Sequence, residues 1–164
     1  MADYLLEIGL EELPAAYMNG AISDLKKHAQ TLFDKERLEY DHVETYATPR
    51  RLVLMVNGIA DVQKDLSEEV KGPSLKVAYK DGKMAKPLEG FLRANGFKEE
   101  DVYTKELPNG TYVFCKREEK GRYTKEILSE VMGNLVLNLK FPKSMRWGSS
   151  ELRYIRPIRW IVSI

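Results

Sequence analysis

The chain has 164 residues, of which 43% are hydrophobic and 31% charged, a balance typical of a globular protein in water. Its 26 basic and 25 acidic residues give a net charge of +1, so the charge of the whole chain does not indicate nucleic-acid binding. No apolar run approaches the roughly 20 residues of a membrane span, and the chain opens without a signal-peptide pattern. The single cysteine, Cys115, excludes an internal disulfide and is interpreted as a buried thiol. We therefore expect a cytoplasmic protein.

The first third of the chain predicts a strand, a helix and two further strands. Residues 4–10 alternate in the manner of a strand, and Pro14 suits the first turn of the helix that follows. The apolar residues of this helix recur at spacings of four and three: Met18, Ile22, Leu25, Ala29 and Leu32. Strands follow at 43–47 and 52–59. The second of these is apolar on both faces, which indicates a central strand covered on both sides.

The middle of the chain predicts a small α+β subdomain over residues 66–120. Residues 61–69 are polar and indicate a linker or a helical connection, and Lys71-Gly72-Pro73 indicates a turn. Three local signals follow in order: a hairpin turn at Asp81-Gly82, a short helix around 87–92 ended by Gly96, and a second hairpin turn at Pro108-Asn109-Gly110.

The last third predicts a helix over 123–139 and then a basic, tryptophan-bearing segment that returns as extended structure to the first sheet. We expect an α+β fold, a strand-helix-strand-strand core with a mixed or antiparallel sheet and a small inserted α+β subdomain. The core comprises residues 1–65 and 121–164, and the insertion comprises residues 66–120. Because the chain stops at Ile164 inside an apolar strand, whose edge would stay unpaired, we expect the N-terminal piece of a longer protein.

The sequence lacks the motifs of common enzyme chemistry. It contains neither a Gly-rich phosphate loop nor a dinucleotide-binding fingerprint. The two histidines, His28 and His42, belong to different predicted elements, and neither has a cysteine or a further histidine near it in the sequence. We expect no catalytic residue and no metal site.

Two charged pairs, Glu11-Glu12 and Arg50-Arg51, follow neighbouring predicted strands and are expected to lie close together. In one interpretation they form a structural cluster of ion pairs, which makes Glu11 and Glu12 candidate interface or ion-pair residues. In the other, the stiff turn at Thr48-Pro49 presents Arg50 and Arg51 to a phosphate or to a partner's carboxylate. Both interpretations stay open.

The segment from Lys140 to Arg159 carries six basic residues and one acidic residue. Such residues bind phosphates, and aromatic side chains stack on unpaired bases, so this segment is a candidate RNA-binding surface. The alternatives are a solvated or ion-paired face and, for the tryptophans, a place in the core, which is expected for Trp160. The candidate RNA-binding residues are Arg50, Arg51, Lys143, Arg146, Trp147, Arg153, Arg156 and Arg159.

Five motifs, in this order, resemble the start of the bacterial glycyl-tRNA synthetase beta subunit. They are Leu5-Leu6-Glu7-Ile8-Gly9 with Glu11-Glu12-Leu13-Pro14, Ala47-Thr48-Pro49-Arg50-Arg51-Leu52, Lys71-Gly72-Pro73, Met145-Arg146-Trp147-Gly148, and Ile155-Arg156-Pro157-Ile158-Arg159-Trp160. Each motif is weak alone, but their order across nearly the whole chain argues against a chance likeness. Gly90-Phe91-Leu92-Arg93 also fits the family's pattern, whereas Leu10 stands where the family usually has threonine.

The resemblance implies a role within a larger enzyme. The family's enzyme is an α2β2 assembly that charges tRNA with glycine using ATP, in which the alpha subunit activates glycine and the beta subunit contributes tRNA recognition and assembly. It implies a glycine–tRNA ligase fragment that is inactive by itself and binds no cofactor, with ATP and Mg²⁺ used through the alpha subunit. The implied partners are that alpha subunit, the remainder of the beta subunit and tRNA(Gly), with no membrane.

Two interpretations of this region remain open. In the first it is an RNA-binding module, whose arginines meet the tRNA backbone. In the second it is a structural subunit-interface scaffold with no direct RNA contact, whose arginines pair with carboxylates. The near-zero net charge favours the second and the local basic excess favours the first, and the dependence of binding on salt distinguishes them.

Overall fold

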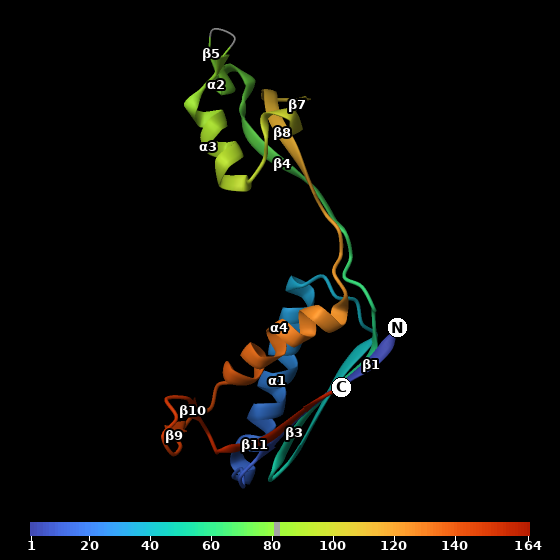
Figure 1. The fold of residues 1–164 in the computed structure, drawn as a ribbon, viewed down its shortest axis with the longest axis vertical. Coiled ribbons are helices and arrows are strands. Elements are labelled where there is room, and N and C mark those ends of the chain that lie inside the picture. Colours follow the sequence, from blue (N-terminus) through green and yellow to red (C-terminus); the bar gives the residue numbers. More distant parts are fainter. Residues whose placement is uncertain (81–82) are drawn as a thin grey trace. The chain divides into compact units, whose positions relative to one another are not determined.

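The computed structural model describes residues 1–80 and 83–164, which divide into two compact units. The core unit comprises Met1–Lys64 and Gly121–Ile164, and the inserted unit comprises Asp65–Lys120. Each unit combines helices with antiparallel sheet (Figure 1), so the expected α+β class is confirmed.

The core unit is built on a four-stranded antiparallel sheet with the strand order β11-β1-β3-β2. Its main elements are β1 (Ala2–Leu10), α1 (Ala15–Lys35), β2 (His42–Thr48), β3 (Arg51–Ile59), α4 (Thr124–Leu137) and β11 (Ile158–Ser163). A small hairpin of β9 (Met145–Arg146) and β10 (Arg153–Tyr154) precedes β11 in the chain. The pairing of β11 with β1 confirms the predicted return of the basic segment to the first sheet.

Helices α1 and α4 lie on one face of this sheet (Figure 1), toward which alternate apolar residues of the strands point. Residues Leu6 and Ile8 of β1, for example, are almost fully buried. Helix α1 turns a line of residues at a spacing of four into this core: Ala21, Leu25, Ala29 and Phe33. Of the predicted stripe, Leu25 and Ala29 are buried, while the remaining members lie half-buried at the margins of that line.

Strand β3 is central in the sheet, as predicted, but the expectation of cover on both faces was wrong. Its residues Leu52, Leu54 and Val56 are buried under the helices, whereas Val53 and Met55 point to the opposite face and stay half-buried. Both helices lie on the first face, so they do not cover the apolar side chains of Val53 and Met55 on the second face.

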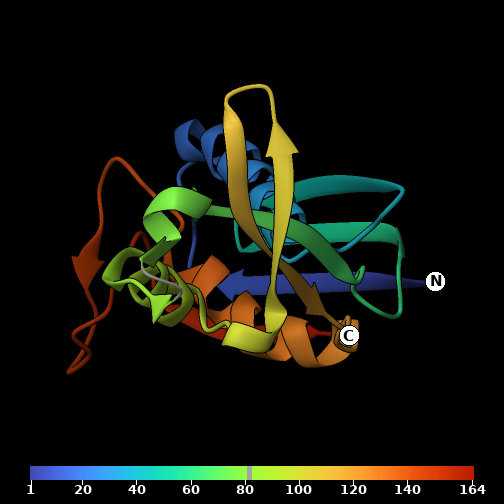
Figure 2. The same ribbon diagram turned by 90° about the horizontal axis from the view of Figure 1, so that it is seen from above.

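The inserted unit contains a three-stranded antiparallel sheet with the order β4-β8-β7. Its elements are β4 (Leu66–Ser74), α2 (Leu75–Ala78), β5 (Tyr79–Lys80), β6 (Lys83–Met84), α3 (Lys86–Asn95), a 3-10 turn (Glu99–Asp101), β7 (Val102–Leu107) and β8 (Gly110–Glu119). The predicted second hairpin is the β7–β8 pair (Figure 2), and Gly96 ends α3 in the left-handed conformation, as expected. Cys115 is buried in this unit's small core.

Two local expectations in the inserted unit were wrong. Residues 66–69 form the start of β4 instead of a linker, and Lys71-Gly72-Pro73 lies within β4 at an irregularity of its pairing with β8. Gly72 lies close to the ring of Phe91, since a Cβ atom at this position would stand 3.0 Å from it. Strands β5 and β6 do pair, but the predicted turn residues, Asp81 and Gly82, lie outside the described residues.

Candidate functional site

One end of the core sheet gathers three segments that the sequence singled out. Here β1 ends before α1, the turn between β2 and β3 reverses the chain, and residue Pro157 leads into β11. Backbone hydrogen bonds join these segments, because the N–H of Leu10 donates to the carbonyl oxygen of Arg50 (2.8 Å) and the N–H of Glu11 to that of Pro157 (3.0 Å). A third, from Leu13 to Pro49, measures 2.6 Å. Candidate residues that are distant in sequence thus share one end of the sheet.

An open hollow of about 670 Å³ lies at this end. Its walls are mainly apolar, and three prolines contribute to them: Pro14, Pro49 and Pro157. Trp147 also lines it, and the indole N–H donates to the carbonyl oxygen of Tyr154 (3.0 Å), which orients the half-buried ring. The hollow combines rigid apolar walls with an aromatic ring, a composition that suits a planar ring or an apolar side chain.

Three charged residues line this hollow, Glu11, Glu12 and Arg156, and backbone carbonyls anchor the guanidinium group of Arg156. Its Nε donates to the carbonyl oxygen of Glu12 (2.8 Å) and its Nη1 to that of Ile155 (3.2 Å). These bonds use carbonyl acceptors, so they orient the guanidinium without neutralising it. Arg156 is thus the cation among the residues that line the hollow, where it lies with the carboxylates of Glu11 and Glu12.

The two charged pairs lie close together as expected, but the pairing of Glu11 and Glu12 with Arg50 and Arg51 was wrong. Glu11 instead pairs with Arg159 of β11, with 3.4 Å from its Oε1 to Nε. The carboxylate that pairs with Arg51 is that of Glu7, with 3.8 Å between Arg51 Nε and Glu7 Oε1. Strand register explains the difference, because Gly9 is opposite Arg51, which brings that arginine beside Glu7 on the same face.

Trp160 is not in the core, so that expectation was wrong too. The side chain is 40% exposed and lies on the sheet face opposite the helices, where the indole N–H donates to Glu7 Oε1 (2.8 Å). The guanidinium carbon of Arg51 lies 6.0 Å from the centre of the Trp160 ring. Glu7 therefore joins a tryptophan from one neighbouring strand to an arginine from the other.

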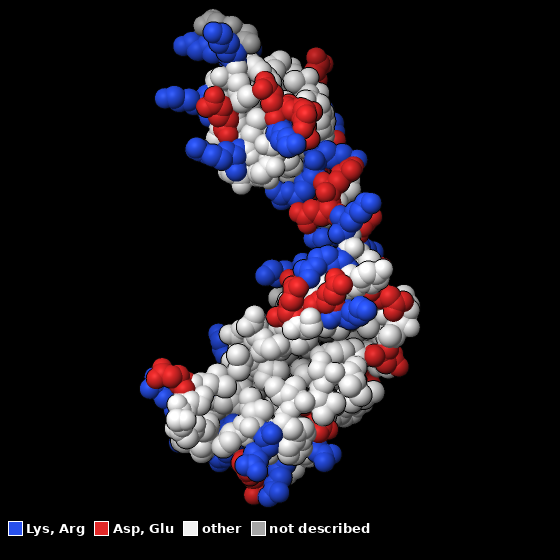
Figure 3. All heavy atoms as spheres, viewed as in Figure 1, with Lys and Arg blue, Asp and Glu red and all other residues white. Residues whose placement is uncertain are grey.

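The remaining candidates divide into bound and unbound cations. In the β9–β10 hairpin, Arg153 donates to the carbonyl oxygen of Ser144 (3.0 Å) and Arg146 lies 3.9 Å from the carboxylate of Glu151. The side chains of Arg50 and Lys143 are exposed and have no ion-pair partner within the part of the chain that the structure describes. Figure 3 shows basic and acidic side chains mixed at the lower end of the core unit.

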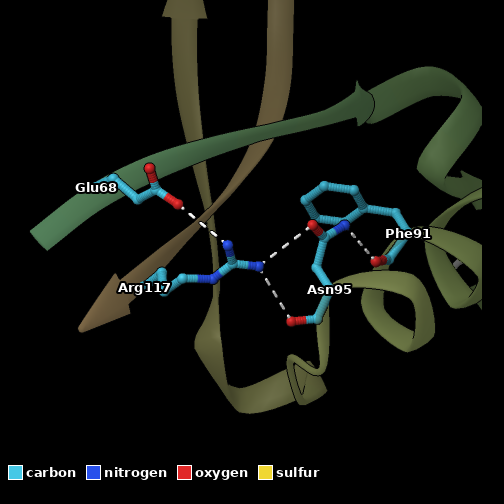
Figure 4. A network of polar contacts seen from close by, with 4 residues as sticks. All are labelled: Glu68, Phe91, Asn95 and Arg117. Carbon is cyan, nitrogen blue, oxygen red and sulfur yellow. Dashed lines mark hydrogen bonds and ion pairs between the residues drawn. The ribbon is translucent and has the colours of Figure 1, made fainter. Parts of the chain in front are cut away.

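The inserted unit holds a second polar cluster, centred on Arg117, which sequence reasoning did not single out. Arg117 of β8 donates to Glu68 of β4 (3.1 Å) and to the carbonyl oxygen of Asn95 at the end of α3 (3.4 Å), as Figure 4 shows. The guanidinium carbon also lies 5.5 Å from the centre of the Phe97 ring. A cation at a helix C-terminus balances the helix dipole, so this cluster has a structural role. In the sequence, Arg117 belongs to a run of charged residues that follows an apolar strand, and such a run is a weak signal for a specific cluster.

The described residues contain neither a cluster suited to a metal ion nor a helix suited to spanning a membrane. In the described ranges, no three histidine, cysteine or acidic side chains gather in a group that would hold a metal ion. None of the helices described is long and apolar enough to span a membrane. The sheet end offers groups that can bind a ligand, namely guanidinium groups, a tryptophan ring and apolar walls.

Comparison with known proteins gives a consistent result over the whole chain. Residues 4–164 match the family described as glycyl-tRNA synthetase beta subunit. Proteins named glycine–tRNA ligase beta subunit are similar to it. One from Clostridioides difficile is 40% identical over 100% of this chain and 24% of its own length. One from Bacillus subtilis is 42% identical over 99% of this chain and 24% of its own length. A third, from Desulfitobacterium hafniense, is 40% identical over 99% and 24%. The chain thus spans about a quarter of the length of the curated relatives it matches.

Proposed function

This chain belongs to the glycyl-tRNA synthetase beta-subunit family, and from that membership we propose that it is the N-terminal part of the tRNA-recognition and assembly subunit of a tetrameric glycine–tRNA ligase. By itself it is non-catalytic. In this proposal the activation of glycine, with its ATP and Mg²⁺, takes place on an alpha subunit. The partners are that subunit, the remainder of the beta subunit and tRNA(Gly), and the compartment is the cytoplasm.

The observation that supports a contact with tRNA is the gathering of cations at the end of the core sheet. Arg156 keeps its charge at the mouth of a hollow that Trp147 lines, and the exposed Arg50 belongs to the turn on the same end. A phosphate attracts guanidinium groups, and an unpaired base can stack on an aromatic ring. We propose that this end touches the tRNA backbone, with Arg50 and Arg156 as the main contacts.

A specific observation favours the second candidate, a structural scaffold without RNA contact. Glu7 and Glu11 each engage an arginine at the same end, so Arg51 and Arg159 are already partly neutralised. Exposed ion pairs of this kind contribute little to stability, but they remove charge from a phosphate-binding surface. In this scaffold interpretation the arginine end (Arg50, Arg51, Arg156 and Arg159) supports a subunit interface, where its arginines pair with carboxylates and do not touch RNA.

A titration of tRNA(Gly) with this chain at two salt concentrations separates the candidates. Contact with several phosphates predicts an affinity that falls steeply as salt rises, and a weaker affinity with a smaller salt slope for Arg50→Glu. The matched control is Lys26→Glu, which makes the same charge change at an exposed position in the middle of α1. Equal loss in both variants would indicate an unspecific charge effect. Absence of binding at low salt by the folded chain would exclude tRNA contact by this region and leave the scaffold.

A further inference from the structure

The C-terminal strand β11 lies at an edge of the core sheet although its composition is that of an interior strand. The sheet order puts β11 and β2 at the two edges, and β11 pairs with β1 alone among the described strands. Proteins protect sheet edges with charges, prolines and short strands. Edge strand β2 carries the carboxylate of Glu44 and the imidazole of His42, and Pro49 follows directly after it. Strand β11 carries one charged residue, Arg159, and three consecutive apolar residues that are exposed: Trp160 at 40%, Ile161 at 50% and Val162 at 36%.

The register identifies which backbone groups of β11 face outward. Leu5 and Ile164 exchange both of their backbone hydrogen bonds, at 2.8 and 3.0 Å, so this is a hydrogen-bonded pair of the antiparallel ladder. Hydrogen-bonded pairs alternate along such a ladder. The N–H groups of Val162 and Trp160 therefore point toward β1, and those of Ile161 and Ser163 point away from the sheet. The open edge of β11 therefore presents the N–H groups and the carbonyl oxygens of Ile161 and Ser163, which are two residues apart along the strand.

A crevice follows the same edge on the helix side. It has a volume of about 300 Å³ and is lined by residues of β1, β11 and α4, among them Leu6, Met132, Val136, Ile161 and Ser163. None of the residues lining it is charged. Figure 3 accordingly shows a broad uncharged surface over the middle of the core unit, where Figure 1 draws α4 and β11. The two β11 residues whose backbone faces outward are also the two whose side chains line the crevice.

We propose that the edge of β11 is a docking site for a further β-strand, supplied by the part of a full-length beta subunit that lies outside these residues. The incoming strand bonds to the outward groups of Ile161 and Ser163, and its alternate apolar side chains fill the crevice against α4. Such a segment has uncharged side chains on that face. This inference rests on family membership and concerns assembly, so it does not depend on whether the arginine end binds tRNA.

The length of the relatives and the effective concentration of a tethered segment indicate which strand occupies the edge of β11. The curated relatives are about four times as long as this chain, since it covers 24% of them, so a beta subunit has ample polypeptide to supply a strand. A segment of the same polypeptide is present at an effective concentration in the millimolar range, well above that of a second molecule in solution. A segment of the same subunit therefore outcompetes a second copy of β11 for this edge.

Amide hydrogen exchange, read residue by residue, tests the proposal in the 164-residue chain and in a full-length beta subunit that contains it. Occupation of the edge predicts that the amides of Ile161 and Ser163 exchange about 100-fold or more slowly in the full-length subunit than in the shorter chain. The amide of Val162, bonded to β1, is protected in both and serves as the internal reference. Equal exchange of Ile161 and Ser163 in the two proteins would overturn the proposal.

A pair of variants tests the same edge through stability. Ser163→Pro removes an outward donor without removing a bond to β1, and Ser163→Ala is its matched control, because both lose the hydrogen bond between Tyr4 Oη and Ser163 Oγ (2.8 Å). The proline is expected to speed the exchange of Ile161 at least 10-fold beyond the alanine, in the full-length subunit alone. Equal effects of the two variants would contradict the proposal. If the amides of Ile161 and Ser163 exchange slowly in the shorter chain and lose this protection on dilution, a second copy of the chain occupies the edge. That result would overturn the proposal.

Discussion

The indole ring of Trp160 lies directly over Gly9 of the neighbouring strand. The two residues are opposite each other in the pairing of β11 with β1, and a Cβ atom at position 9 would overlap the six-membered part of the ring. The same tryptophan donates its indole N–H to Glu7, two residues earlier on the same face. The absence of a side chain at position 9 therefore decides where the largest residue of β11 lies.

The first prediction concerns this contact. Gly9→Ala forces the indole from its place, and overpacking of this kind lowers the free energy of unfolding by about 1–3 kcal/mol. The control is Gly20→Ala in α1, where a new Cβ meets no atom within 4 Å and where alanine stabilises a helix by about 0.5–1 kcal/mol. Urea unfolding of both variants measures the difference. A Gly9→Ala protein as stable as the wild type would contradict the contact.

A second prediction concerns the hydroxyl group of Tyr154. The side chain is 2% exposed and packs edge-on against Phe141, but its buried oxygen has no hydrogen-bond partner among the described residues. Removing an unpaired buried polar atom is neutral or favourable, so Tyr154→Phe should leave the free energy of unfolding unchanged or raise it by about 1 kcal/mol. Tyr4→Phe is the control, because Tyr4 bonds to Ser163, and it should cost about 1 kcal/mol.

The third prediction is a dependence of stability on pH in the alkaline range. Burial raises the pKa of the Tyr154 phenol above its ordinary value. A pKa that is higher in the folded than in the unfolded state gives stability that is fully present below pH about 10 and is lost as the pH rises further. The melting temperature should therefore fall above pH 10, and less steeply for Tyr154→Phe. Part of the slope should remain in that variant, since burial also raises the pKa of Tyr4.

The fourth prediction concerns the ion pair of Arg122 and Glu130. The two terminal nitrogens of the Arg122 guanidinium group, Nη1 and Nη2, donate to the Glu130 carboxylate at 3.1 and 2.5 Å, and this hydrogen bonding lowers the pKa of Glu130. The pair therefore favours the folded state above the ordinary pKa of glutamate and loses that effect as the pH falls. An NMR titration of Glu130 should show its pKa rise in Arg122→Gln. The same pKa in both proteins would mean that the pair does not form in solution.

The fifth prediction concerns the inserted unit. Arg117 connects β4, β8 and the end of α3, and its side chain is only 31% exposed. Arg117→Ala should lower the stability of this unit by about 1–3 kcal/mol, since charged hydrogen bonds and packing are lost together. Lys116→Ala is the matched control, because Lys116 is 55% exposed and pairs with the exposed Glu118 on the same strand. Hydrogen exchange of the β7–β8 amides reports the stability of this unit separately from that of the core.

Much of the fold was predictable because local periodicity reflects local structure. The spacing of apolar residues in α1, the alternation in β1 and the Asn-Gly turn before β8 each identified an element that the structure contains. The motifs that pointed to the beta-subunit family were likewise readable in the sequence, and the comparisons confirm that family. Where glycine and proline occurred inside a strand, as in β4, the same local signals predicted a turn that the structure does not contain.

The partners of individual side chains could not be predicted, because they depend on strand register and on which face a strand turns inward. Because the two charged pairs follow neighbouring predicted strands, we expected Glu11 and Glu12 to pair with Arg50 and Arg51, whereas register pairs Glu11 with Arg159 and Arg51 with Glu7. A shift of one residue would have turned Trp160 toward the helices. Composition and periodicity thus determined the elements and the family. Only tertiary pairing, which brings distant residues side by side, decided the partners of Glu11 and Arg51, the exposed position of Trp160 and the crevice along β11.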